Sequence, residues 1–215
     1  EAFDGADVVV TSGYDGILKP LKEGLDIKLS HVVSAIDYSA DEGVVITTDQ
    51  GTFEADYCIC SVPLGVLKAN NIQFTPELPS SYRDSIENLG FGSVTKLALK
   101  FEEPFWDIET QYFGITTEPK GRWNYWLSYR TFSDENILLG LSVGDYALTA
   151  DRMTDAEMVE DALDVLRTVW EDDVTEPIEV LATHWATDPF TLGAYAFPRP
   201  GNRKSDFDDL GEPIS

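Results

Sequence analysis

Basic residues are scarce in this sequence, and their scarcity excludes whole classes of partner. Fifteen lysines and arginines stand against 39 acidic residues, which gives the 215-residue chain a formal net charge of −24. Such a charge repels phosphate groups, so we expect neither a nucleic-acid partner nor an anionic membrane surface. Cationic ligands such as amines are favoured instead. A solvated acidic surface without any ligand explains the charge equally well.

Cysteine and histidine are also scarce, with two of each in the chain. Cys58 and Cys60 lie two positions apart in an apolar run, where both side chains would point to one face of a strand. This spacing favours a pair of small core residues over a disulfide or a metal site. His31 and His184 lie far apart, which gives a zinc site little support. We therefore predict that the chain holds no metal.

Long apolar runs and several sequence signals are missing as well. No segment approaches the roughly 18 apolar residues of a membrane-spanning helix, and no secretory signal opens the chain. We therefore expect a cytoplasmic protein without a membrane partner. The sequence has no G-x-G-x-x-G turn, P-loop or G-x-S-x-G elbow. Gly90 and Gly92 resemble the start of a dinucleotide turn, but a predicted strand follows and the third glycine is missing.

The residues that are present indicate a packed protein with two parts. A length of 215 residues suits one large or two small domains, and 43% hydrophobic residues are ordinary for a globular protein. Strands predicted over 27–29, 32–38 and 44–48 form a β-meander with the turns between them. Residues 57–62 are nearly all apolar and are predicted as a strand buried on both faces. The proline-containing stretch 70–80 is predicted to connect this part to a second one.

The second part is predicted to hold a mixed, largely antiparallel sheet covered by helices, so the fold class is mixed α/β. Its strands are expected over 93–101, 112–116, 122–129, 137–143 and 178–183. Thr154 and Glu157 form a capping box, and apolar residues at helical spacing follow as far as Trp170. Trp123 and Trp126 lie in an aromatic cluster that suits either a sheet core or the wall of a ligand site.

Lys96 is the most unusual residue of the strand over 93–101. Alternation places Thr95, Leu97, Leu99 and Phe101 on one face and Val94, Lys96, Ala98 and Lys100 on the other. Lys96 then lies between small apolar neighbours. An exposed lysine on a solvent face is the ordinary interpretation, because lysine is almost never fully buried. A lysine directed into a cofactor cavity is the alternative, and the strand pattern leaves both open.

An ordered set of short motifs resembles the flavin-containing amine oxidases, the family of polyamine oxidases, monoamine oxidases and lysine-specific histone demethylases. The set covers nearly the whole chain in the family's order, although each motif alone is weak. It comprises Gly13-Tyr14, 25–29, 31–36, Gly51, Ala55-Asp56, 61–67, Phe74, Pro76, Leu78-Pro79, 89–92, Lys96, Phe105-Trp106, Trp185, 188–190 and 193–195.

This resemblance implies a catalytic residue and a substrate pocket. In that family the lysine at the position of Lys96 approaches the flavin N5 atom through a bound water, so Lys96 is the implied catalytic residue. Tyr195 is implied as one aromatic wall of the pocket that flanks the amine carbon. Val94 lies two residues before the lysine, where polyamine oxidases can carry an aromatic residue. A preference for polyamines is therefore open.

The resemblance also implies FAD as the cofactor. Trp185 is implied to pack near the isoalloxazine ring. Val33 is implied to meet the adenine half of FAD through its backbone, which an ordinary strand valine can also do. The turn formed by Ser61, Val62 and Pro63 is implied to lie near the cofactor.

The implied reaction is oxidation of a small-molecule amine. A neutral amine loses hydride from its α-carbon to the flavin, water hydrolyses the imine to an aldehyde, and O2 reoxidises the flavin to give H2O2. The flavin supplies the difficult chemistry, while the protein orients the amine. An aromatic pocket of low polarity favours the deprotonated amine, because burial lowers the pKa of an ammonium group.

The sequence departs from that family at both ends. The amino-terminal G-x-G-x-x-G unit and the carboxy-terminal Gly-Glu-x-Thr/Ser segment are absent, so the chain resembles an excised middle that is inactive alone. Residues 1–70 would belong to the FAD domain, residues 71–200 to the substrate domain, and residues 201–215 would begin the return to the FAD domain.

Two other functions stay open. A related flavin amino-acid oxidase or desaturase shares this architecture, although no arginine is recognisable as the partner of a substrate carboxylate. A non-catalytic acidic binding module that has lost its cofactor half is the second alternative.

Overall fold

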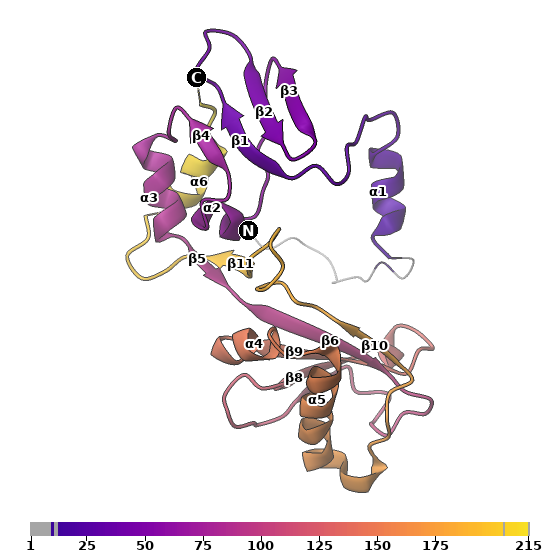
Figure 1. The fold of residues 1–215 in the computed structure, drawn as a ribbon. Helices are drawn as coiled ribbons and strands as arrows, with labels where there is room; N and C mark the ends of the chain where they lie inside the picture. Colours follow the sequence, from indigo (N-terminus) through magenta and orange to yellow (C-terminus); the bar gives the residue numbers. More distant parts are fainter. Residues whose placement is uncertain (1–9, 11–12, 204, 215) are drawn as a thin grey trace, which may run out of the picture.

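Two large sheets and a small two-stranded one organise the described part of the chain (Figure 1). The structure is a computed structural model that describes residues 10, 13–203 and 205–214. The strands of the first sheet are β1 (Val33–Asp37), β2 (Val44–Thr48), β3 (Gly51–Ala55) and β4 (Gln73–Thr75), in the order β3-β2-β1-β4. β1, β2 and β3 pair antiparallel and form the predicted meander, while β4 pairs with β1 in parallel. The first sheet therefore extends past residue 70, into the stretch predicted as a connector.

Short helices accompany the first sheet. They are α1 (Asp15–Leu21), α2 (Leu64–Lys68), α3 (Ser80–Asn88) and α6 (Ser205–Asp208), followed by a 3₁₀ turn over Asp209–Gly211. A small core of Ile36, Val44, Val66 and Ile72 holds β1, β2 and α2 together. The carboxy-terminal residues return to this unit, because the Tyr82 hydroxyl on α3 donates to the Glu212 carbonyl.

The second sheet has five strands, and all of its neighbours pair antiparallel. In sheet order they are β10 (Glu179–Ala182), β6 (Val94–Lys100), β9 (Ile137–Val143), β8 (Tyr125–Ser128) and β7 (Tyr112–Gly114). Together with the first sheet and the helices, this arrangement confirms the mixed α/β class. Each predicted strand of the second part is present, with ends that differ by a few residues.

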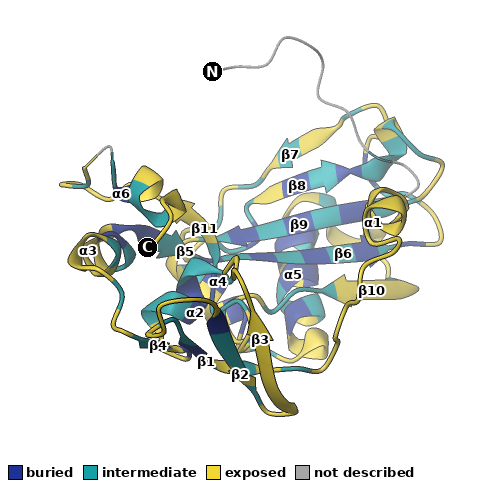
Figure 2. Cartoon of the chain, turned by 90° about the horizontal axis from the view of Figure 1, so that it is seen from above, coloured by how far each residue is buried: buried dark blue, intermediate teal, exposed yellow. Residues whose placement is uncertain are grey.

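The main core lies between the second sheet and helices α4 (Asp145–Ala150) and α5 (Asp155–Trp170). Short 3₁₀ turns occur at Tyr129–Thr131 and Glu171–Asp173. Figure 2 shows buried residues concentrated along β6, β9 and α5. Leu97 and Leu99 of β6 are fully buried there. Burial of such a side chain stabilises the fold by about 1.5–3 kcal/mol. The opposite face of β6, which carries Lys96, is half-buried.

Two sequence features of this core are confirmed. The Thr154 hydroxyl accepts from the Glu157 amide at 3.3 Å, and the Glu157 carboxylate accepts from the Thr154 amide at 2.8 Å. The capping box therefore starts α5 as predicted. Trp123 and Trp126 are fully buried, and the Trp126 indole donates to the Trp123 carbonyl at 2.7 Å. These two rings belong to the sheet core rather than to a ligand wall.

The prediction of a buried strand over 57–62 is wrong. Tyr57 and Ile59 are 90% and 93% exposed, and Cys58 and Cys60 are exposed too, so the two cysteines are not core residues. An apolar run becomes a buried strand only where neighbouring strands pair with it, and no described strand lies beside this segment. The predicted strand over 27–29 is missing for the same reason.

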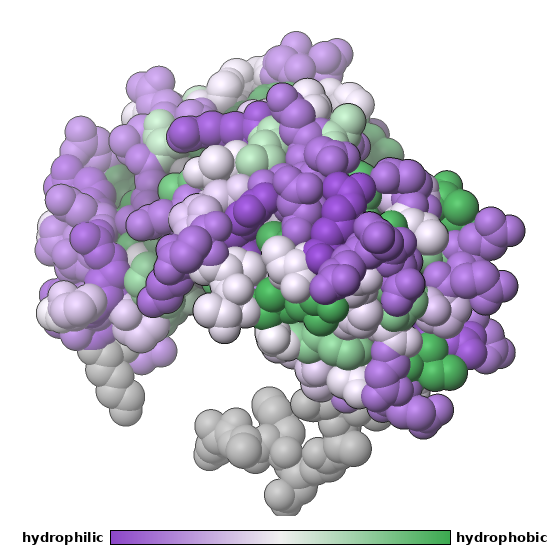
Figure 3. All heavy atoms as spheres, turned by 90° about the horizontal axis from the view of Figure 1, so that it is seen from below, coloured by the Kyte–Doolittle hydropathy of each residue, from purple (hydrophilic) through white to green (hydrophobic). Residues whose placement is uncertain are grey.

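The surface reflects the acidic composition. The face drawn in Figure 3 is mostly hydrophilic, with hydrophobic atoms in small groups. Among the helices of the described residues, none is both long and apolar enough to cross a membrane.

Candidate functional site

Three segments that are far apart in the sequence meet where the two sheets join. β5 (Gly90–Gly92) pairs antiparallel with β11 (Ala194–Phe197), and β6 continues from β5 after a single residue. Helix α2 reaches the same place through Gly65, where an added methyl group would lie 2.3 Å from the Thr191 carbonyl oxygen. Only glycine allows so close a backbone approach. This junction brings the 61–65 turn and the 184–195 segment to the start of β6.

Lys96 lies in β6 on the face opposite α5, half-buried and opposite Leu141 of β9. Its ammonium group has no ion pair or hydrogen bond among the residues that the structure describes. Lys100, on the same face, binds Glu135 at 2.9 Å and Glu179 at 3.2 Å. Of these two lysines, only Lys96 is therefore free to meet another group.

The backbone of Lys96 fixes the segment that leads to Trp185. The Lys96 amide donates to the Thr183 hydroxyl at 2.9 Å, and the Thr183 amide donates to the Lys96 carbonyl at 2.9 Å. Thr183 directly follows β10, and Trp185 comes two positions later. The end of β10 thus holds the tryptophan near the lysine strand.

Trp185 lines an open hollow of about 570 Å³ formed by residues 182–190. Its indole is 42% exposed. Its carbonyl accepts from the Gly193 amide at 2.7 Å and from the Thr191 hydroxyl at 2.6 Å. These two hydrogen bonds close the 185–193 loop and hold the Trp185 backbone, while the indole stays partly exposed to solvent.

Tyr195 occupies an irregular position in β11. Its φ of 63° lies in the left-handed region, which non-glycine residues seldom adopt, and the register of β11 against β5 shifts between Ala194 and Ala196. A bulge of this kind redirects a side chain out of the regular alternation. The side chain is 63% exposed.

The residues implied in cofactor binding lie in the first unit. Val33 begins β1, and its side chain and that of Val62 pack against the same small core. Ser61 is exposed, and Pro63 precedes α2, where its carbonyl accepts from the Val66 amide at 3.0 Å. Through Gly65 this turn approaches Phe91 of β5 and the loop before β11. The structure therefore brings the 61–63 turn close to the 191–195 segment. Val33 lies in β1 and does not take part in this junction.

Val94, the remaining predicted pocket residue, opens β6 on the same face as Lys96. It is half-buried and lies opposite Val143 of β9.

A buried carboxylate behind Trp185 was not predicted from the sequence. Asp151 is 2% exposed and accepts from the Thr187 amide at 2.8 Å and from the Thr187 hydroxyl at 2.9 Å. His184 contacts the Asp151 carbonyl and the Asp155 carboxylate, both at 2.9 Å. Two hydrogen bonds raise the pKa of His184: the bond to the Asp151 carbonyl contributes most, and the bond to the Asp155 carboxylate contributes next. No sequence spacing reveals this cluster, because its halves are more than 30 positions apart.

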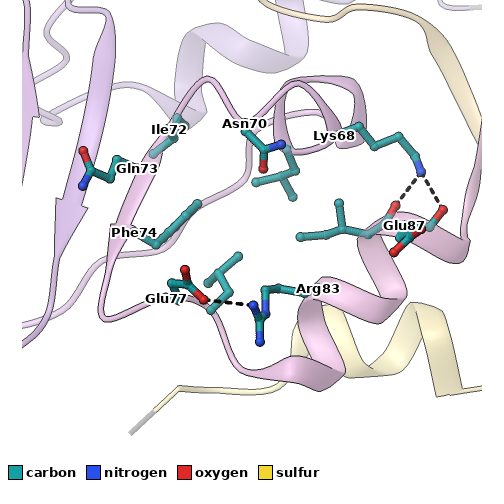
Figure 4. Close-up of a pocket in the computed structure, with 11 residues that line it drawn as sticks. Lys68, Asn70, Ile72, Gln73, Phe74, Glu77, Arg83 and Glu87 are labelled. Atoms are coloured by element: carbon teal, nitrogen blue, oxygen red, sulfur yellow. Dashed lines mark hydrogen bonds and ion pairs between the residues drawn. The ribbon is translucent and has the colours of Figure 1, made fainter.

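A larger hollow, of about 830 Å³, lies between α2, β4 and α3 (Figure 4). Its two cations are already engaged. The Lys68 ammonium donates to the carbonyls of Ile86 and Glu87, and Arg83 binds Glu77 at 2.9 Å. Burial lowers the pKa of Lys68. This hollow offers no free reactive group, so we place the candidate site at Lys96 and Trp185 instead.

The residues around Lys96 suit one side of a flavin. The exposed Trp185 indole and the Lys96 ammonium, which has no partner among the described residues, lie on adjoining segments. Tyr195, whose aromatic ring is carried by the bulge in β11, follows Trp185 in the chain. The sequence contains no G-x-G-x-x-G turn that would receive the phosphates of a dinucleotide. Over the ranges 13–203 and 205–214, no group of three or more potential ligands is placed to hold a metal ion.

Comparisons with known proteins point to one family. The model of the flavin-containing amine oxidoreductases matches residues 1–215. Lysine-specific histone demethylase 1 homolog 1 of Oryza sativa subsp. japonica is 37% identical over 98% of the chain. Probable polyamine oxidase 4 of Arabidopsis thaliana is 32% identical over the whole chain. A solved structure of an engineered putrescine oxidase superposes on 81% of the chain with a TM-score of 0.65 and 20% identity.

The chain spans only part of these proteins. It covers 25% of the rice relative, 43% of the Arabidopsis relative and 39% of the putrescine oxidase chain. The structural likeness supports the same fold, in agreement with the mixed α/β architecture.

Proposed function

Because the chain belongs to the family of flavin-containing amine oxidoreductases, we propose that it supplies the amine-facing side of an FAD site. The observation that supports this proposal most strongly is Lys96. It is half-buried and without a partner among the described residues, and its backbone is bonded to the segment that carries Trp185. A structural lysine on the same face, Lys100, is paired with two carboxylates instead.

We assign a role in cofactor or amine binding, or in the reaction, to each of the site residues. When bound, the flavin would take hydride from the amine α-carbon and return the electrons to O2. Trp185 would bind the flavin ring with its exposed face, and Tyr195 would border the amine carbon. Lys96 would hold a water molecule at its ammonium group and assist reoxidation or imine hydrolysis. Val33 and the turn of Ser61, Val62 and Pro63 would contact the cofactor from the first unit.

The substrate that we propose is a small cationic amine. A net charge of −24 favours the approach of cations. Polyamines are candidates because a matching relative is a probable polyamine oxidase, and methylated lysine side chains are candidates because others are histone demethylases. A cytoplasmic location and the division into 1–70, 71–200 and 201–215 stay predictions. Without a phosphate-binding turn, residues 1–215 alone would not oxidise amines.

The first test examines whether Trp185 meets a flavin. Riboflavin, which carries the ring without the phosphates, is titrated into the chain while tryptophan fluorescence is recorded. We expect a saturable quenching that disappears in Trp185→Phe and persists in Trp170→Phe, since Trp170 lies at the end of α5 and packs against the main core. Equal quenching of the parent chain and Trp185→Phe would contradict the proposed flavin wall.

The second test addresses Lys96 in a complete oxidase. Residues 1–215 replace the matching 215-residue segment of the Arabidopsis relative, and the FAD-loaded chimaera is mixed with amines. We expect the 450 nm band to bleach with an amine and to recover in air. Lys96→Met should slow the recovery or aldehyde release by about 100-fold, the usual scale of acid–base assistance. Lys100→Met is the matched control; equal rates for both variants would remove Lys96 from the reaction.

A further inference from the structure

His184 faces two hydrogen-bond acceptors, one at each ring nitrogen. Nδ1 lies 2.9 Å from the Asp151 carbonyl oxygen, and Nε2 lies 2.9 Å from an oxygen of the Asp155 carboxylate. A carbonyl and an ionised carboxylate can only accept, and a neutral imidazole carries one N–H. Both contacts can therefore be hydrogen bonds only while the ring is doubly protonated. The neutral ring must turn a lone pair toward one of these oxygens.

The same cluster anchors the turn on both sides of Trp185. His184 precedes the tryptophan and binds the Asp151 carbonyl. Thr187 follows it and donates its amide and its hydroxyl to the Asp151 carboxylate. The other oxygen of that carboxylate lies 3.3 Å from the hydroxyl of Thr95, the neighbour of Lys96 in β6. One buried aspartate thus connects the lysine strand to the tryptophan turn.

We propose that Asp151 and His184 are positioning residues for Trp185, and that protonation of His184 holds the turn in place. The cationic ring bridges the end of α4, at Asp151, and the start of α5, at Asp155. Loss of the proton breaks one of these contacts, so the Trp185 turn gains freedom. The link to catalysis rests on the proposed role of Trp185 beside the flavin, whereas the coupling between the proton and the turn does not.

The direction of the pH dependence follows from the raised pKa of His184. A group whose folded pKa is raised stabilises the fold fully below its unfolded pKa, near 6.5 for histidine. That contribution is lost as the pH rises through the folded pKa. Asp151 and Asp155 are the charged groups that face the ring among the described residues, and both favour the imidazolium. The turn is therefore tight below the unfolded pKa of about 6.5 and loosens as the pH rises through the folded pKa.

The test follows the proton and the turn separately in the flavin-free chain. NMR titration of the two imidazoles, distinguished by His31→Asn, gives the midpoint of His184. Acrylamide quenching of tryptophan fluorescence, taken as the difference from Trp185→Phe, gives the accessibility of Trp185. We expect a His184 midpoint above 6.5, and a rise in Trp185 accessibility with the same midpoint. In His184→Gln the accessibility should not vary with pH.

Asp155→Ala decides whether the two events are coupled, because Asp155 is exposed and its removal leaves the core intact. We expect both midpoints to move down together by the same amount. Asp145→Ala is the matched control, since Asp145 also lies in the first turn of a helix but makes no contact with the ring. A constant Trp185 accessibility through the His184 titration, or midpoints that move apart, would overturn the inference. Either result would leave the flavin role of Trp185 intact.

Discussion

At the scale of single residues, neighbours decide what a side chain does. Lys96 and Lys100 share one face of β6 and have the same intrinsic chemistry. Lys100 is neutralised because β9 and β10 bring Glu135 and Glu179 beside it. Lys96 has no such partner in the described part of the chain. The alternation of the strand predicts the shared face but not this difference, because the partners come from other strands.

Glycine positions show the same dependence on neighbours. A methyl group at Gly140 of β9 would lie 2.8 Å from ring carbons of Trp126, which is fully buried and has no room to shift. We expect Gly140→Ala to lower the free energy of unfolding by about 1–3 kcal/mol, as in other overpacked cores. Urea titration measures the change. Gly114→Ala in β7 is the control, since a methyl group there meets nothing within 4 Å; similar losses in both variants would refute the packing argument.

At the scale of elements, the sequence shows where α5 starts but not how it is fixed to the sheet. Asp161 in the middle of the helix binds the side chains of Arg122 and Trp123, at 2.9 and 2.7 Å. It also accepts from the Tyr146 hydroxyl at 2.7 Å. Burial, as the larger effect, and the hydrogen bond to Asp161 together raise the pKa of Tyr146 to about 12. One carboxylate therefore joins α5 to α4 and to the turn that precedes β8.

Removing this carboxylate leaves three donors without an acceptor. We expect Asp161→Ala to cost about 3 kcal/mol, because the pair with Arg122 is largely buried. The pKa of Tyr146 should also fall below 12, which absorbance of the phenolate near 295 nm reports. Asp164→Ala is the control, since its carboxylate is mostly exposed and lies 3.8 Å from Arg122. A stability loss without a change in the Tyr146 titration would argue against the proposed network.

At the scale of the whole molecule, the two sheets are completed to different degrees. The second sheet has its helices and a large continuous core. The first sheet has a small core, and α1 beside it buries no residue. Residues 57–61 are mostly apolar and exposed. Most of the stability of the chain therefore resides in the second sheet.

A substitution at Ile59 distinguishes the buried strand predicted from the sequence from the exposed segment seen in the structure. A strand buried on both faces would not tolerate a charge at Ile59, whereas the structure leaves this side chain 93% exposed. We expect Ile59→Asp to change the free energy of unfolding by no more than about 0.5 kcal/mol. Ile36→Asp, at a residue that is 7% exposed, should cost more than about 3 kcal/mol. Chemical denaturation compares the two, and a large loss at Ile59 would restore the buried strand.

The local elements could be predicted from the amino-acid sequence alone. The capping box at Thr154, the alternation of β6 and the turns of the meander depend on residues close in the chain, so their spacing is sufficient to predict them. The family also followed from short motifs in order, and the match over residues 1–215 confirms it. Missing local motifs, such as the phosphate-binding turn, were equally visible in the sequence.

Which distant segments meet became visible in the folded structure. It placed Gly65 against Thr191, united Asp151 with His184 and Thr187, and left residues 57–61 exposed. Each outcome depends on partners far away in the chain, and hydrophobicity or spacing at one end carries no information about the other. Burial and hydrogen bonding are properties of pairs, and the pairs are set by the packing of the two sheets.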